Sequence, residues 1–261
     1  MTTSLSPNQH TLGIDAARSV PRPIPFSRLV RVEWAKATDT RAARWLLVLV
    51  ALSGIAMMLV PVLAPTTFDQ TYASYLRVAA LGLTMLLPVV AILLFTGEWS
   101  QRSIMTTFTQ EPRRLRVLNA KLAVSMMLGG GAAAVGGVLA AAGIGLATAS
   151  GRSLESGLSV GDVIGYVIYV LLTVLAGVAL GALLQSSAAA IAASFALPAA
   201  AAALGAGSSL VSDWIDMSTT WNAVLENDWA GHVPQILFST VFWVAAPLAA
   251  GVVRTLRRDV G

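Results

Sequence analysis

Six stretches of about twenty apolar residues recur along this chain, and they limit its fold more than any other feature. At 1.5 Å rise per residue, a helix of that length crosses the ~30 Å hydrocarbon core of a bilayer. Lipid offers no partner for backbone N–H and C=O groups, and the alternating pattern of a membrane β-barrel is absent, so the spans must be helices. The sequence therefore predicts an all-α, polytopic membrane protein. The six spans are expected at about 45–64, 77–96, 122–148, 162–184, 188–207 and 236–253.

Composition supports this fold class and removes several kinds of chemistry. Of the 261 residues, 56% are hydrophobic and only 11% are charged, and the mean hydropathy is +0.73. The chain has no cysteine, which excludes disulfides, thiolate catalysis and thiolate metal sites. Residues 1–25 lack an apolar segment, so no cleavable signal peptide is expected. This N-terminal segment is predicted to be disordered and cytoplasmic.

Basic residues predict the orientation of the spans. Fifteen Lys and Arg residues fall in segments that six spans would place on one side, whereas only Arg77 and Arg152 fall on the other. The positive-inside rule therefore places both termini in the cytoplasm. Residues 254–261 are expected to form a cytoplasmic tail. The basic excess is read as a topology signal and as an attraction to the lipid bilayer, and no nucleic-acid partner is expected.

The predicted spans contain no charged residue or histidine near their centres. A charge at a helix centre costs about 2.5–3.5 kcal/mol on insertion scales, and one found there usually has a function. Its absence argues against a proton-coupled transporter, an intramembrane protease or another membrane-embedded enzyme. His10 and His232 are interpreted as solvated residues. No catalytic, cofactor-binding or metal-binding residue is expected in this chain.

Two segments outside the spans have amphipathic patterns. In residues 26–44, Phe26, Leu29, Val30 and Trp34 fall on one helical face, as in a helix that lies in the membrane interface. In the loop before the last span, tryptophans recur every seven or eight residues, which favours short helices that rest on or dip into the outer leaflet, or a simple aromatic belt. These tryptophans are Trp214, Trp221 and Trp229.

Small residues are concentrated in the third to fifth spans. The fourth span carries Gly161 with Gly165 and Gly177 with Gly181, both at the GxxxG spacing. Small residues allow helix backbones to approach closely in lipid. The pattern predicts either a tightly packed bundle or a dimer interface.

A long polar segment, expected to be a cytoplasmic loop at residues 97–121, separates the second and third spans. It reads Gly97-Glu98-Trp99, then Arg102-Ser103-Ile104, Thr107, Pro112-Arg113-Arg114 and Ala120-Lys121. This pattern resembles the first cytoplasmic loop of bacterial ABC transporter permeases of the ABC-2 type, the six-span class used for multidrug, antibiotic and lipid-linked export. The chain has Arg102-Ser103 where that family commonly has Gly-Thr.

The resemblance implies that the chain is a non-catalytic permease subunit in the bacterial inner membrane. A short coupling helix at about 101–110 would dock onto a separate ATP-binding subunit, two copies of which would bind ATP and Mg. A second permease subunit, identical or paralogous, is also implied. The chain itself has no G-x-x-x-x-G-K-[ST] phosphate loop, since its only lysines, Lys36 and Lys121, each follow alanine. The candidate coupling residues are Glu98, Arg102, Ile104, Thr107, Phe108, Pro112, Arg113 and Arg114.

The alternative hypothesis is a non-transporting membrane protein, for example a scaffold, a sensor or an assembly factor. The spans suit an apolar or amphipathic cargo, but they identify no particular substrate.

Overall fold

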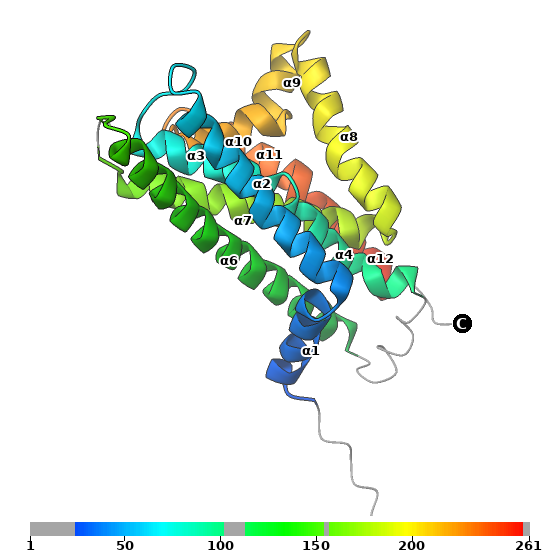
Figure 1. Cartoon of the computed structure of the whole chain (residues 1–261). Helices are drawn as coiled ribbons and strands as arrows, with labels where there is room; N and C mark the ends of the chain where they lie inside the picture. The colour runs from blue at the N-terminus through cyan, green and yellow to red at the C-terminus, as the bar shows by residue number, and fades with distance from the viewer. Residues whose placement is uncertain (1–23, 102–112, 154–156, 258–261) are drawn as a thin grey trace, which may run out of the picture.

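The structure is a computed structural model and describes residues 24–101, 113–153 and 157–257 (Figure 1). The secondary-structure elements in these ranges are helices, as the apolar runs predict. Six helical segments are long and apolar enough to cross a membrane, which confirms the six predicted spans. They are α2 (Arg41–Leu63), α3 with α4 (Tyr72–Thr84 and Leu87–Ser100), α6 (Arg114–Ala149), α7 (Val160–Leu184), α8 (Ser187–Gly205), and α11 with α12 (Val233–Thr240 and Ala246–Arg257).

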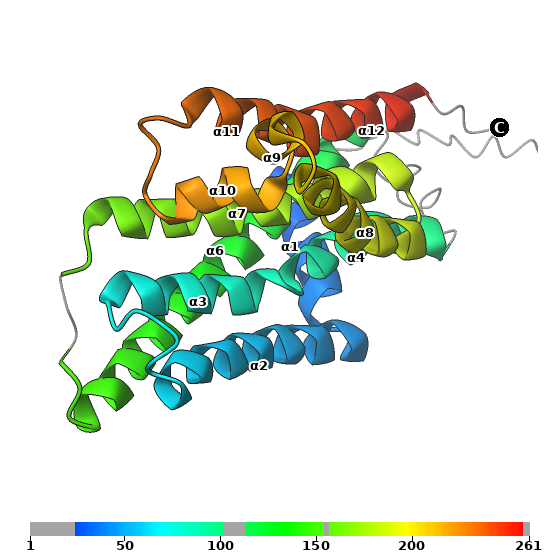
Figure 2. The same ribbon diagram turned by 90° about the horizontal axis from the view of Figure 1, so that it is seen from above.

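The spans alternate in direction, so the described chain has two distinct ends. The end at which α4 and α12 finish and α2 and α6 begin is called the basic end here, because most of the chain's basic residues fall there. The short helix α1 (Phe26–Thr38) crosses the bundle at this end, below α2 and α6 in Figure 1. The opposite end carries the turns between α2 and α3 and between α6 and α7, and is called the far end (Figure 2).

The two helices that flank the predicted loop at residues 97–121 extend into it from both sides. Helix α4 runs past Gly97 to Ser100, and α6 begins at Arg114. Helix α12 likewise continues to Arg257, so the first residues of the predicted tail 254–261 are helical. Hydropathy locates only the apolar part of a helix, whereas arginine, lysine and glutamate are good helix formers that extend it beyond the lipid.

The predicted interfacial helix at residues 26–44 is divided into two elements. Helix α1 ends at Thr38, and Thr40 then caps the start of α2 by accepting a hydrogen bond from the Ala43 N–H at 3.1 Å. Threonine is a favoured N-cap because its hydroxyl satisfies a backbone donor that the first turn leaves free. Arg41 and Arg44 therefore belong to the first span. The predicted disorder of residues 1–25 falls almost wholly outside the described residues.

Two spans are interrupted near prolines. Helices α3 and α4 are separated at Met85 and Leu86, immediately before Pro88, which has no N–H to donate to the carbonyl four residues earlier. In the last span a π-helical stretch, Val241–Ala245, precedes Pro247. Pro61 and Pro198, in contrast, lie inside continuous helices. Proline alone therefore did not predict where a span would break.

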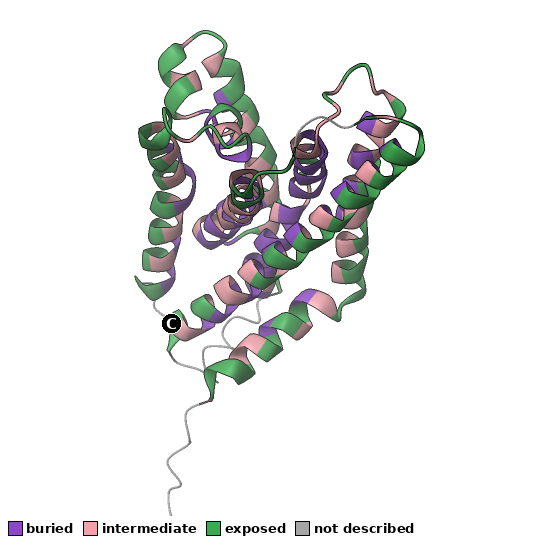
Figure 3. Cartoon of the chain, turned by 90° about the vertical axis from the view of Figure 1, so that its left-hand side faces the viewer, coloured by how far each residue is buried: buried purple, intermediate pink, exposed green. Residues whose placement is uncertain are grey.

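Helix α7 lies at the centre of the bundle, and its GxxxG glycines serve contacts within the chain. A Cβ on Gly177 would lie 2.6 Å from the carbonyl oxygen of Pro88, and a Cβ on Gly165 would meet the carbonyl oxygen of Val224. The core around α7 is apolar and well covered, whereas the outer faces of the peripheral helices are exposed (Figure 3). Of the two predicted roles, close packing inside the bundle is the one observed for these glycines.

The spans predicted at 162–184 and 188–207 are joined by a tight turn. Helix α7 ends at Leu184, Gln185 adopts a left-handed conformation with φ of 53°, and α8 begins at Ser187. The left-handed residue after a helix is a common way to end it, because it turns the chain away from the axis. Two polar residues are thus sufficient to reverse the chain between two spans.

Candidate functional site

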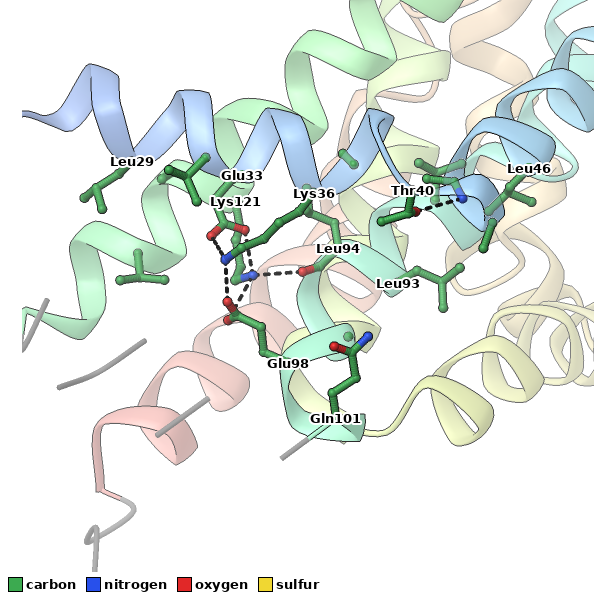
Figure 4. A pocket seen from close by; sticks show the side chains of 18 of the residues that line it. Leu29, Glu33, Lys36, Thr40, Leu46, Leu93, Leu94, Glu98, Gln101 and Lys121 are labelled. Atoms are coloured by element: carbon green, nitrogen blue, oxygen red, sulfur yellow. Dashed lines mark hydrogen bonds and ion pairs between the residues drawn. The ribbon is translucent and has the colours of Figure 1, made fainter. Parts of the chain in front are cut away.

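Four charged residues from three separate helices meet at the basic end (Figure 4). Helix α1 contributes Glu33 and Lys36, the last turn of α4 contributes Glu98, and the second turn of α6 contributes Lys121. Helices α4 and α6 are the two helices that flank residues 102–112. We call these four residues the charge cluster. It contains the only two lysines of the chain.

Each ammonium group of the charge cluster contacts both carboxylates. Lys36 Nζ lies 2.6 Å from Glu33 Oε1 and 2.5 Å from Glu98 Oε1. Lys121 Nζ lies 2.8 Å from Glu33 Oε2 and 3.2 Å from Glu98 Oε2, and it also donates to the Leu94 carbonyl at 3.0 Å. The two positive and two negative charges form a closed, neutral ring that joins α1, α4 and α6.

Most of the charge cluster is shielded from solvent. The side chain of Lys121 is 2% exposed and that of Glu33 is 4% exposed, whereas the side chain of Lys36 is 39% exposed. Removing one partner from a buried ion pair typically costs about 3–5 kcal/mol, because the remaining charge is left uncompensated in a low dielectric. The cluster is therefore a strong constraint on how these three helices are arranged, whatever its net contribution to stability.

The pKa of Lys36 reflects two opposing effects. Burial lowers the pKa of its ammonium group, but the hydrogen bonds and charges of Glu33 and Glu98 outweigh burial and raise the pKa above its ordinary value of 10.5. Lys36 is accordingly charged at neutral pH.

Apolar contacts beside the charge cluster hold α1 in the same position. Ala37 packs with Leu94 and Val124, and Val30 adds to this group at its edge. Glu33 shares the helix face of Val30 and Ala37, since the three residues are spaced three and four apart. The face that α1 turns to the bundle is therefore apolar with one buried carboxylate in its middle.

Further hydrogen bonds connect the start of α6 to the ends of the chain. Arg116 Nη2 donates to the Ile24 carbonyl at 2.6 Å, and Arg114 Nη1 donates to the Thr255 carbonyl at 2.7 Å. Gln185 Nε2 donates to the hydroxyl of Thr255 at 3.0 Å, and this links the turn after α7 to α12. Guanidinium groups suit this work because they present several fixed donors. Helix α6 is thus connected to both α1 and α12.

The end of α4 is joined to α8 by a hydroxyl relay. Ser187 Oγ lies 2.7 Å from Thr96 Oγ1 and 2.9 Å from Ser100 Oγ. The two helices that flank residues 102–112 are consequently in contact with every other element that reaches the basic end.

The predicted coupling residues fall into two groups. Arg102, Ile104, Thr107, Phe108 and Pro112 lie outside the described residues. Arg113 is exposed and Arg114 is partly buried, whereas Glu98 is buried in the charge cluster. Glu98 was predicted as the start of a docking surface, but its carboxylate faces inward to the lysines. Its contribution is to position the end of α4.

The predicted apolar face of α1 is only partly covered within this chain. Leu29 and Val30 are partly buried, whereas Phe26 is 43% exposed and Trp34 is 37% exposed. The exposed pair leaves an apolar surface on α1, as an interfacial helix requires.

The predicted short helices before the last span are present as α9 (Ser209–Trp214) and α10 (Met217–Leu225). They do not lie flat on the far end, because Trp221 is fully buried in a cluster with Ala176, Ala201, Trp243 and Val244. Trp214 is 37% exposed and stacks edge-on with Phe238, and Trp229 is partly buried. The three tryptophans therefore do not form one belt.

The connection between α9 and α10 reaches well into the bundle. Trp243 Nε1 donates to the Ile215 carbonyl at 2.7 Å, and Trp243 lies about 15 Å along the last span at 1.5 Å per residue. The neighbouring Asp216 is 6% exposed and caps α10, accepting hydrogen bonds from the Ser218 N–H and hydroxyl. Asp216 lies in the segment that the sequence predicts as a loop before the last span. Its position just before a short helix was the available signal for a capping role.

The chain is thus defined by its fold as a multi-pass, helical membrane protein. Comparisons with protein-family models, with curated proteins and with solved structures found no match. Within residues 24–101, 113–153 and 157–257, no three histidine or acidic side chains are grouped closely enough to hold a metal ion.

Proposed function

We propose that this protein is the membrane-spanning permease subunit of an ATP-driven exporter in a bacterial inner membrane. In this proposal the basic end faces the cytoplasm, as the positive-inside rule favours. A separate ATP-binding subunit docks on the segment between α4 and α6 and drives the movement of the spans. The cargo is an apolar or amphipathic molecule taken from the bilayer, and a second permease subunit completes the pathway.

The observation that supports the proposal best is the charge cluster. Coupling requires that a movement of residues 102–112 be transmitted to the spans. Glu98 and Lys121 pair the two flanking helices directly, and each also pairs with a residue of α1, Glu98 with Lys36 and Lys121 with Glu33. A buried, closed ring of charges resists separation because each displaced charge would lose its partners at low dielectric.

The segment between α4 and α6 is also the longest connection at the basic end. The α7–α8 turn needs only two residues, whereas α4 and α6 are separated by residues 101–113. This longer connection carries the Gly-Glu-Trp, Arg-Ser-Ile and Pro-Arg-Arg pattern that resembles the coupling loop of ABC-2 permeases. It is the part of the chain best suited to contact a cytoplasmic partner.

A membrane scaffold or sensor is the second candidate. The same rigid basic end would serve a protein that holds a partner without moving cargo. The two functions differ in one measurable property, since a permease must retain an ATP-binding subunit whose ATP hydrolysis depends on it.

Copurification tests the proposal directly. The tagged chain, coexpressed with an ATP-binding-cassette subunit from an adjacent gene, is expected to retain that subunit, and the complex should hydrolyse ATP. A variant with Ile104→Glu and Phe108→Glu should lose the subunit, whereas the matched double change Leu158→Glu and Val160→Glu at the far end should retain it. Failure of the wild-type chain to retain any ATP-binding subunit would favour the scaffold.

A further inference from the structure

A pocket of about 880 Å³ opens between α1 and the basic-end turns of α2, α4 and α6. Its volume falls in the upper part of the range of about 300–1,000 Å³ that small-molecule sites usually have. Helix α1 contributes one face to it, with Arg28, Val32 and Lys36 at four-residue spacing, and Thr40 follows at the start of α2. Glu33, Lys36, Glu98 and Lys121 of the charge cluster form part of its lining.

The pocket has an apolar wall and a charged edge. The wall is formed by Leu29, Val32, Leu46, Val90, Leu93 and Leu94. Figure 4 shows the charged side chains gathered together, with Leu46 and Leu93 on the other side of Lys36. Val32 is 47% exposed and Leu93 is 37% exposed, so part of the wall is open to the surroundings of the chain. Such a site fits a molecule with an apolar body and a polar group at one end.

The charges of the lining favour a negatively charged group. Arg28, Lys36 and Lys121 are opposed by Glu33 and Glu98, which leaves one excess positive charge. The ammonium group of Lys121 contacts Glu33, Glu98 and the Leu94 carbonyl. Lys36 is more exposed and donates to Glu33 and Glu98, while an ammonium has three N–H donors. Its third donor has no protein partner among the described residues and is available to an anionic ligand.

We propose that this pocket binds one anionic phospholipid, whose phosphate contacts Lys36 and whose acyl chain lies along the apolar wall. The protein lies in a bilayer, which supplies such molecules at high local concentration. Arg28 is about 12 Å from Lys36 along the helix, at 1.5 Å per residue, and attracts the lipid without sharing the same contact. The lipid would fill the space under α1 and fix the angle of α1 to the bundle. This site requires no ATP-binding subunit, so it stands apart from the proposed export function.

Native mass spectrometry of the purified full chain tests the site, with phosphatidylglycerol and phosphatidylcholine of identical acyl chains as probes. The wild-type chain should retain one phosphatidylglycerol about tenfold more tightly than phosphatidylcholine. Arg28→Gln should weaken that binding about fivefold, and Lys36→Gln should weaken it at least as much, since about 1 kcal/mol is expected for each cation near an anionic lipid. Arg31→Gln is the matched control, because Arg31 lies on the same helix but outside the pocket lining.

A second variant separates the pocket from the folding role of the charge cluster. Val32→Trp fills the apolar wall without changing any charge, and it should abolish tight phosphatidylglycerol retention at an unchanged unfolding temperature. Val48→Trp, at an exposed position on α2, should not affect retention. Equal retention of the two lipids by the wild-type chain, or unchanged retention in Val32→Trp, would overturn the proposal. Full displacement of the lipid by glycerol 3-phosphate at equal concentration would overturn it as well, because the pocket would then be a site for free phosphate compounds.

Discussion

A carboxylate in the middle of an apolar helix face determines how α1 attaches to the bundle. Glu33 is 3% exposed, and both of its oxygens are held by lysines, one from its own helix and one from α6. A glutamate in that position would be costly to bury alone, so its presence between Val30 and Ala37 already implies a cationic partner. The sequence contained this signal, but it could not say which of many basic residues would supply the charge.

Replacing Lys121, the buried cation of the charge cluster, should show how much the cluster contributes to the stability of the fold. Lys121→Met keeps an unbranched side chain of similar length but leaves Glu33 and Glu98 with only Lys36 between them. We expect the free energy of unfolding in mixed micelles to fall by about 3–5 kcal/mol. Arg31→Gln on the exposed face of α1 should change it by less than about 0.5 kcal/mol. A loss no larger than that control would mean that the charge cluster does not hold the helices together.

The stability of the protein should also depend on pH through Lys36. Because the folded-state pKa of Lys36 is raised above 10.5, its contribution is fully present below the unfolded value and is lost as pH rises through the folded value. The unfolding temperature of the wild-type chain should therefore fall more steeply above about pH 10.5 than that of Lys36→Met. Parallel curves for the two proteins would contradict the assignment.

At the scale of elements, α7 is central because its small residues allow neighbours to approach on several sides. Gly177 faces the backbone of Pro88, where the break between α3 and α4 leaves the chain close to α7. Gly130 and Gly137 on α6 have open space where a Cβ would lie. Glycine content alone therefore does not distinguish a packing site from an exposed helix surface. The GxxxG glycines of α7 pack closely, but Gly136 and Gly143 on α6 also do so without that spacing.

A matched pair of glycine changes tests this difference. Gly177→Ala should lower the free energy of unfolding by about 1–3 kcal/mol, because the new methyl group would overlap the Pro88 carbonyl and force the helices apart. Gly137→Ala should leave it unchanged or raise it by up to about 1 kcal/mol, since alanine is the better helix former. The measurement is the same unfolding titration for both variants. Equal effects would show that the contact between α7 and Pro88 is not tight.

Helix positions were predictable to a large extent, whereas tertiary features were not. Apolar runs located all six spans, and the short gap between the fourth and fifth runs located the turn between α7 and α8. The burial of Asp216 could not be predicted from hydropathy. A short helix that folds back into the bundle has the same composition as an amphipathic segment at the surface. The charge cluster was missed for a related reason. Its members are separated by up to 88 positions, and only the packing of three helices brings them together.

At the scale of the whole molecule, the basic end is a continuous layer and the far end is more divided. Helix α1 meets α4 and α6 through the charge cluster, α6 meets α12 through Arg114, and α4 meets α8 through Ser187. The far end instead carries the α9–α10 connection, which enters the bundle between other helices. In the proposed exporter the layer would receive the movement of the ATPase, and the far end would open to release the cargo.

The most direct test of this account is photo-crosslinking from a single position in the complete complex. A photoreactive amino acid in place of Ile104, between α4 and α6, should crosslink the chain to an ATP-binding subunit. The same amino acid in place of Glu226, at the far end, should give no such product. A crosslink from position 104 alone is the result that the account predicts. A complex that copurifies intact but crosslinks only from position 226, or from neither position, would contradict the claim that the ATPase acts through this connection.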